Sequence, residues 1–219
     1  MKRALLGLFA MLPLGQVLAA EIPLYPTGPS EDSAFLRFFN AGETPLELNA
    51  ANGASLRLAG EQRASDFLTV PAGKPIQGSL KQGDAQQALD VSVEPGEFAT
   101  VVGIPAAQGL NLVTVREQPD DFNALKASLA FYSLDGSCAN AGLQAAGRNV
   151  DIFKDVAEGS LQRRSINPLK LSVQLRCGGA AVGQPLDLGQ LAAGQRYTLF
   201  LVPSAQGPRL FQAVDNLAN

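Results

Sequence analysis

Apolar and polar residues alternate most regularly between Leu169 and Arg176, where the sequence reads LKLSVQLR. Successive side chains of a β-strand point to opposite faces, so four apolar side chains would share one face and four polar side chains the other. The same period of two is found from Leu89 to Val93 and from Leu56 to Leu58. These segments predict half-buried antiparallel strands.

Other segments are apolar on both faces, which is typical of strands that are covered from two sides, as in a sandwich or at a domain interface. These segments are 34–39, 98–104, 110–115, 125–134 and 197–202. Turn-forming pairs such as Asn52-Gly53, Pro95-Gly96 and Asp135-Gly136 interrupt the chain at intervals of about ten residues. Because no long amphipathic helix is found, the pattern predicts an all-β fold.

The second half of the chain repeats features of the first. Residues 94–98, followed by Pro105 and Gly109, are echoed 98 positions later by residues 192–196, Pro203 and Gly207. Duplication of one β-sandwich explains this echo, and chance similarity between two sets of strands is the alternative. We therefore expect two tandem small antiparallel β-sandwich domains, at residues 21–118 and 119–219.

Residues 1–20 have the order of parts found in an export signal. Lys2 and Arg3 precede a short apolar run at 4–14, and small residues at 17–20 offer a cleavage site. The run is shorter than the ~20 apolar residues that a membrane-spanning helix needs. We expect the signal to be removed and the mature protein to work in the periplasm.

Cys138 and Cys177 are the only cysteines of the chain. Since exported proteins meet an oxidising environment, a disulfide is expected, and it would close a loop of about 40 residues worth about 3–4 kcal/mol in the chain-entropy model. Two thiols without any histidine fall short of a zinc site, so neither metal nor cofactor is expected.

Composition excludes several other classes of function. The chain contains no histidine, so neither a Ser-His-Asp nor a Cys-His system can form, and we expect no enzyme. A net charge of −3 offers no basic field for nucleic acid. The carboxylate pairs Glu31-Asp32 and Asp120-Asp121 lie in polar segments without apolar neighbours, which favours solvated loop charges over acid-base catalysis.

Four polar or aromatic residues are candidate contacts for a partner or a polysaccharide. Tyr25, between Pro23 and Pro26, either contacts a ligand or fixes an extended entry segment. Arg163, Arg164 and Asn167 form the most distinctive polar cluster. The cluster either docks a partner or an anionic sugar, or is simply the entry to the strand after Pro168.

Several segments in order resemble one known family. They are Leu24–Pro29, Ser33–Gly42, Ser65–Phe67, Lys154–Val156 and Ser165–Ser172, and the most specific block is Ile-Asn-Pro-Leu-Lys-Leu-Ser at 166–172. Across nearly the whole mature chain this order is similar to the periplasmic alginate O-acetylation family AlgF. The pair Cys138 and Cys177 departs from the alginate members, which leaves open whether alginate or cellulose is the polymer.

The resemblance implies a non-catalytic adaptor in exopolysaccharide O-acetylation. Its implied partners are a membrane-embedded O-acyltransferase protein that donates acetyl groups, periplasmic acetyltransferases of the SGNH-hydrolase type, and the polysaccharide itself. A periplasmic chaperone or assembly module that captures a β-strand of another chain is the alternative. An acetyltransferase acting alone would need a nucleophile arrangement that the sequence does not contain.

Overall fold

The computed structural model describes residues 33–118 and 123–218, and all of its regular structure is β. The first eight strands are β1 (Ser33–Asn40), β2 (Leu46–Ala50), β3 (Ser55–Leu58), β4 (Leu68–Pro71), β5 (Ile76–Gln82), β6 (Ala85–Val91), β7 (Phe98–Ala106) and β8 (Gly109–Glu117). The second eight are β9 (Ala127–Ser133), β10 (Ala141–Ala145), β11 (Val150–Val156), β12 (Ser160–Ile166), β13 (Leu169–Cys177), β14 (Ala180–Leu191), β15 (Arg196–Val202) and β16 (Arg209–Val214). Within the described ranges, no helix is long and apolar enough to cross a membrane.

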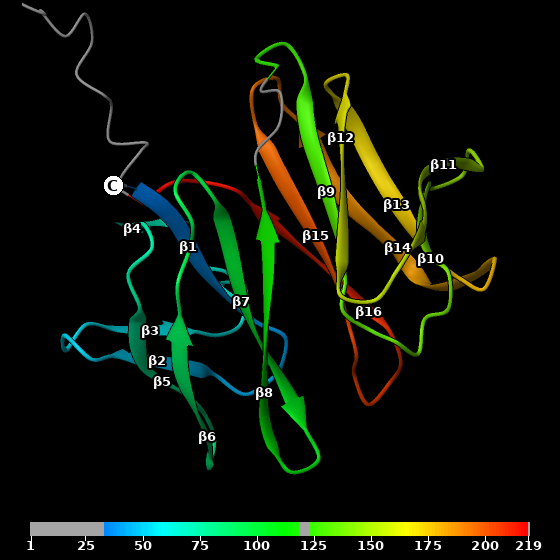
Figure 1. The fold of residues 1–219 in the computed structure, drawn as a ribbon. Coiled ribbons are helices and arrows are strands. Elements are labelled where there is room, and N and C mark those ends of the chain that lie inside the picture. The colour runs from blue at the N-terminus through cyan, green and yellow to red at the C-terminus, as the bar shows by residue number, and fades with distance from the viewer. Residues whose placement is uncertain (1–32, 119–122, 219) are drawn as a thin grey trace, which may run out of the picture.

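The strands form two sandwich-like halves with the same topology (Figure 1). The first half has sheets of order β4-β1-β7-β8 and β3-β2-β5-β6, and the second has sheets of order β12-β9-β15-β16 and β11-β10-β13-β14. Adding eight to each strand number of the first half gives the order of the second. This correspondence supports duplication over chance similarity and confirms the expected all-β, two-sandwich fold.

One strand pair in each half runs parallel, which the sequence did not predict. β1 pairs with β7 through partners such as Phe35 and Phe98, and β9 pairs with β15 through partners such as Phe131 and Leu199. β1 and β7 are separated along the chain by five strands, four of which build the other sheet, so they need not run in opposite directions as the strands of a tight hairpin do. Alternation identifies a strand but carries no information about its direction.

Each half encloses its own apolar core. In the second half, β13 directs Leu171, Val173 and Leu175 inward, where each is buried, while Lys170 on the other face is exposed. The half-buried strand predicted from the LKLSVQLR alternation is thereby confirmed. The corresponding core of the first half lies between its own two sheets and includes Leu36, Leu80 and Val101 among other buried residues.

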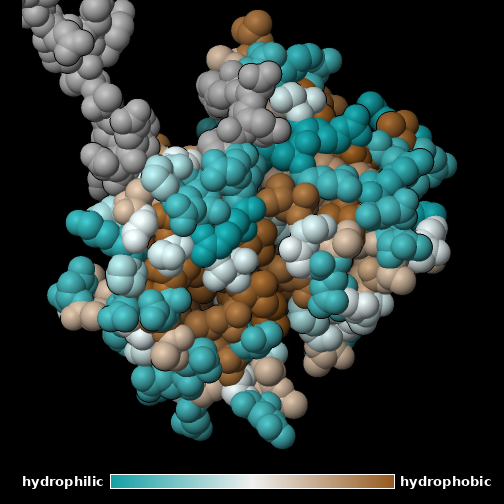
Figure 2. Space-filling model, viewed as in Figure 1, coloured by the Kyte–Doolittle hydropathy of each residue, from teal (hydrophilic) through white to brown (hydrophobic). Residues whose placement is uncertain are grey.

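A third apolar layer lies between the two halves. It joins Phe39 and Val102 of the first half to Tyr132 and Phe200 of the second, and all four are nearly inaccessible to solvent. The Phe39 and Phe200 rings stack with centroids 4.1 Å apart. In Figure 2, apolar residues gather near the middle of the molecule, between the more polar surfaces on either side. The sheets β4-β1-β7-β8 and β12-β9-β15-β16 are thus covered on both faces, as the runs at 34–39 and 197–202 predicted.

Some expectations concern residues outside the described ranges. These are the signal at 1–20, Tyr25 and the carboxylate pairs at 31–32 and 120–121. β8 ends at Glu117 and β9 begins at Ala127. The domain division after residue 118 stays a prediction.

Candidate functional site

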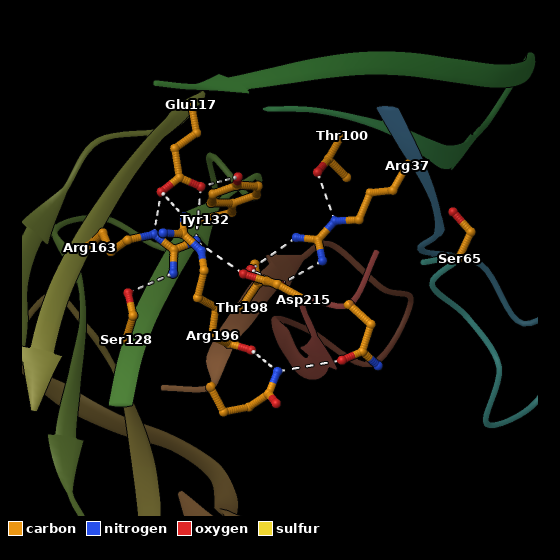
Figure 3. A network of polar contacts seen from close by, with 12 residues as sticks. Arg37, Ser65, Thr100, Glu117, Ser128, Tyr132, Arg163, Arg196, Thr198 and Asp215 are labelled. Carbon is orange, nitrogen blue, oxygen red and sulfur yellow. Dashed lines mark hydrogen bonds and ion pairs between the residues drawn. The ribbon is translucent and has the colours of Figure 1, made fainter. Parts of the chain in front are cut away.

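A buried network of polar side chains lies at the junction of the two halves (Figure 3). Three guanidinium groups and two carboxylates meet there, and they come from both halves. The charged members are Arg37 on β1, Glu117 at the end of β8, Arg163 on β12, Arg196 at the start of β15 and Asp215 directly after β16. We call this set the junction network.

Arg37 is the central residue of the network, with a side chain that is 0% exposed. Its Nε donates to Thr100 Oγ1 at 2.9 Å, its Nη1 to Asp215 Oδ1 at 2.7 Å and its Nη2 to Thr198 Oγ1 at 2.9 Å. The Thr198 hydroxyl in turn donates to Asp215 Oδ1 at 2.6 Å. The guanidinium also lies 4.3 Å from the centre of the Phe67 ring. A first-half side chain therefore holds two side chains of the second half.

Glu117 makes the reciprocal connection. Its carboxylate accepts two hydrogen bonds from Arg163, one of them from Nη2 at 2.9 Å, and one from Arg196 Nη2 at 3.2 Å. The Tyr132 hydroxyl also donates to it, at 3.4 Å. Arg163 Nη2 reaches on to Asp215 Oδ2 at 3.1 Å. Each carboxylate of the network thus bridges at least two arginines.

Burial and charge act in opposite directions on these groups. Burial alone would raise the pKa of Asp215, but the nearby charges of Arg37 and Arg163 outweigh it and lower the pKa below its usual value. Burial lowers the pKa of Arg163, but the hydrogen bond and charge of Glu117 raise it overall. Burial, followed by the charge of Glu117, raises the pKa of the Tyr132 hydroxyl. The first two shifts favour the charged forms of Asp215 and Arg163.

The end of the chain strengthens the same junction. Phe67 N donates to Asn216 O at 2.8 Å, and Ala218 N donates to Phe67 O at 2.9 Å, which forms a short parallel bridge. Phe67 precedes β4, so the segment after β16 adds main-chain bonds to the first half. Apolar packing, ion pairs and main-chain bonds all fix the orientation of one half against the other.

The structure separates the residues that the sequence grouped as contacts. The Arg163 side chain is only 8% exposed and faces the junction, so a partner could reach its guanidinium only if the halves separated. Arg164 is exposed, and its Nη1 donates to Ile152 O at 2.6 Å. Asn167 is exposed and accepts a hydrogen bond from Lys126 Nζ. Arg164 and Asn167 remain candidate surface contacts, and Tyr25 lies outside the described residues.

Sequence reasoning missed Arg37, Glu117 and Asp215 as members of a cluster. One signal was present, because Arg37 lies within an otherwise apolar segment, FLRFF. A charged residue on a strand buried from both sides requires a partner. The sequence does not show that the partner, Asp215, lies 178 positions away.

The expected disulfide is confirmed. Cys138 and Cys177 are bonded, with Cα atoms 4.8 Å apart. The bond ties the segment before β10 to the end of β13, within the outer sheet of the second half. Such a bond is typical of proteins that fold outside the cytoplasm.

The geometry of the junction network suits mechanical connection. Each carboxylate is paired with two arginines and accepts a hydroxyl hydrogen bond, from Tyr132 at Glu117 and from Thr198 at Asp215. Among residues 33–118 and 123–218, no group of three or more Cys, Asp or Glu side chains is placed to hold a metal ion.

The family model described as "Alginate O-acetyl transferase AlgF" matches residues 4–198. The chain belongs to the AlgF family. The "Alginate biosynthesis protein AlgF" of Pseudomonas aeruginosa PAO1 is 31% identical over 186 residues, which cover 85% of this chain and 80% of that protein. The protein of the same name from Pseudomonas putida KT2440 is 26% identical over 185 residues, covering 84% of this chain and 80% of that one.

Solved structures were also matched. The C-terminal domain of AlgF from P. aeruginosa is 28% identical, covers 41% of this chain and 98% of its own, and has a TM-score of 0.35. A putative cell adhesion protein from Bacteroides uniformis is 10% identical, covers 85% of this chain and 100% of its own, and has a TM-score of 0.31. The resemblance to the AlgF family predicted from the sequence is confirmed by the family model and the curated relatives.

Proposed function

We propose that this protein is a non-catalytic periplasmic accessory protein required for O-acetylation of a secreted exopolysaccharide. The observation that carries the proposal is membership of the AlgF family along residues 4–198. The curated relatives are named for alginate biosynthesis, which makes alginate the first polymer to test. The disulfide supports an extracytoplasmic location.

An adaptor rather than an acetyltransferase is supported by the residues themselves, although the family description contains the word transferase. Acyl transfer by a serine needs a base to take its proton, and the chain has no histidine. Ser137, the serine of the Asp135-Gly136-Ser137 turn, donates its hydroxyl to Asp135 Oδ1 at 2.6 Å. That contact is local to the turn, and within residues 33–118 and 123–218 no side chain from another segment hydrogen-bonds to the Asp135 carboxylate.

Within the same proposal, the protein bridges a membrane acetyl-donor protein and periplasmic SGNH-type acetyltransferases. Its two halves differ in charge: residues 33–118 contain six basic and nine acidic residues, whereas residues 123–218 contain nine basic and six acidic residues. Opposite charges favour different partners, because complementary potentials steer association and reject like-charged surfaces. The junction network holds the two differently charged surfaces in one fixed arrangement.

Capture of a foreign strand is less well supported. The longest edge strand, β14, carries glycines with φ of +66° at Gly183 and +69° at Gly189, and its pairing with β13 shifts register twice. Bulges that twist an edge strand discourage pairing with another chain. This edge is therefore protected against strand addition.

Co-purification tests the bridging role. The exported protein, tagged at its C-terminus, should recover both the membrane O-acyltransferase and an SGNH acetyltransferase, and each of these alone should bind the purified protein. Recovery of neither partner would contradict the adaptor role. Transfer of acetyl groups to polymer by the purified protein alone would contradict its non-catalytic character.

A further inference from the structure

A polar pocket is lined by residues of β10, β11 and β13 and of the turns beside them. These strands belong to the sheet β11-β10-β13-β14, which lies on the side of the second half that faces away from the first (Figure 1). The volume of the pocket is about 370 Å³, which lies within the ~300–1,000 Å³ range of small-ligand sites. The side chains that matter here are Gln144, Asp151, Lys154 and Arg176. None of them takes part in the junction network.

The disulfide builds the rim of this pocket. Asn140 and Gly178, which line it, follow Cys138 and Cys177 closely in the sequence. Gly178 N also donates to Ala139 O at 2.5 Å, so the two rim segments are joined by a covalent bond and a main-chain hydrogen bond. A rim fixed before binding saves the entropy of ordering it when a ligand arrives.

The backbone around the pocket is unusual. Asn140 and Asp155 line the pocket with φ of +48° and +50°, and only one other non-glycine residue of the described ranges, Asn149, has a positive φ. A Cβ at Gly142 would lie 2.8 Å from Phe153 O, so only glycine permits this approach of β11 to β10. Conformations that few residues adopt often cluster where a fold shapes a binding site.

Donors and acceptors alternate around the pocket. Asp151 accepts from Gln144 Nε2 at 2.7 Å through Oδ1 and pairs with Lys154 Nζ at 2.7 Å through Oδ2. The hydrogen bond from Lys154, then that from Gln144, lowers the pKa of Asp151, which keeps this carboxylate ionised. Arg176 forms no ion pair with a residue of the described ranges, and its Nη2 donates to Gly179 O. The guanidinium keeps further donors for a ligand.

We propose that this pocket binds one pyranose unit of a polysaccharide chain, with Arg176 donating to ring substituents and Asp151 accepting from ring hydroxyls. Sugar hydroxyls both donate and accept, so they match a wall in which charged donors and acceptors alternate without a large net charge. The inference deepens the proposed function, on which it rests, because it gives the accessory protein a direct contact with polymer. A uronate chain and a neutral glucan chain share this chemistry.

Titration of the mature, disulfide-bonded protein with sugars tests the site. The probes are an oligomannuronate tetramer and cellotetraose, with sorbitol as a polyol that has no ring, and amide chemical shifts are followed by NMR. At least one tetramer should shift the amides of Gly142, Gly178 and Gly179 in a saturable way, while the amide of Gly103 in the first half stays unchanged. The tetramer that binds identifies the source of the pyranose. If neither tetramer binds, or sorbitol produces the same shifts, the proposal is overturned.

Variants localise the binding. Arg176→Gln should weaken the affinity for the tetramer that binds at least tenfold. Lys154→Gln should weaken that affinity severalfold, and because the Lys154 side chain is 69% exposed, its replacement should leave the fold intact. Arg148→Gln is the matched control, since Arg148 is exposed in the β10–β11 turn and outside the pocket. Equal losses in Arg176→Gln and Arg148→Gln would mean non-specific charge attraction and would overturn the site. The binding test needs no acetylation, so its failure is distinguishable from failure of the proposed function.

Discussion

Arg37 and Asp215 lie 178 positions apart in the chain, yet Arg37 Nη1 and Asp215 Oδ1 are 2.7 Å apart in a pair whose side chains are 0% and 3% exposed. One residue belongs to the first strand of the described chain and the other follows the last. Their contact joins the first strand of the first half to the segment that follows the last strand of the second half. The contact therefore helps to fix the orientation of one half against the other.

Replacement of Asp215 by Asn should destabilise the protein strongly. The substitution leaves Arg37 and Arg163 buried with one carboxylate fewer, and breaking a buried ion pair on one side costs about 3–5 kcal/mol. Urea unfolding measures the loss. Glu61→Gln, an exposed carboxylate without an ion pair in the described ranges, is the control and should change the free energy of unfolding by less than about 0.5 kcal/mol. Equal effects of the two substitutions would show that the junction network carries no stability.

Stability should fall in acid through Asp215. Its pKa is lower in the folded protein than in the unfolded chain, so its contribution is present above the unfolded value of about 3.9 and is lost as the pH falls through the folded value. Since the chain has no histidine, the free energy of unfolding should change little between about pH 5 and 8. Urea midpoints across pH 2–8 check both statements. A steep change near pH 6.5 would contradict them.

Truncation of Phe200 to Ala should loosen the junction. The Phe200 ring is fully buried, stacks on Phe39 at 4.1 Å and meets the Tyr132 ring edge-on at 5.2 Å. Loss of a buried aromatic ring typically costs about 3–5 kcal/mol. Thermal unfolding reports this loss, and limited proteolysis should show faster cleavage between the halves. Leu125→Ala, at a residue that is already 79% exposed, should behave like the unmodified protein.

Replacement of both Cys138 and Cys177 by Ser should lower stability by about 3–4 kcal/mol in the chain-entropy model. Denaturant unfolding with and without a reductant measures the effect. In the presence of the reductant, the denaturant midpoint of the unmodified protein should fall to nearly that of the variant. An unchanged midpoint on reduction would show that the bond contributes nothing to the folded state.

Much of the fold could be predicted from local pattern. The alternation at 169–176 identified β13 because it depends on neighbouring residues alone. The echo between the halves anticipated their common topology because similar stretches of sequence form similar strands and turns. The parallel pairing of β1 with β7 could not be predicted, since direction depends on how the chain returns through a second sheet.

The candidate site was harder to predict for the same reason. Arg163 was a candidate contact for a partner or an anionic sugar because it belongs to the most distinctive polar cluster of the sequence. Its side chain instead turns toward Glu117, which belongs to the other half. Charge pairs across a domain junction depend on three-dimensional packing and leave no periodic signal. The disulfide, by contrast, followed from two cysteines and an export signal alone.

The acetyl content of secreted polymer shows whether this protein is required for O-acetylation. NMR of polymer from a strain lacking the gene, compared with the same strain complemented by the exported protein, gives both acetylation and yield. If the protein is required for O-acetylation, the deletion strain should secrete polymer in normal yield but without acetyl groups, and the complementing protein should restore them. Unchanged acetylation in the deletion strain would contradict the proposed role.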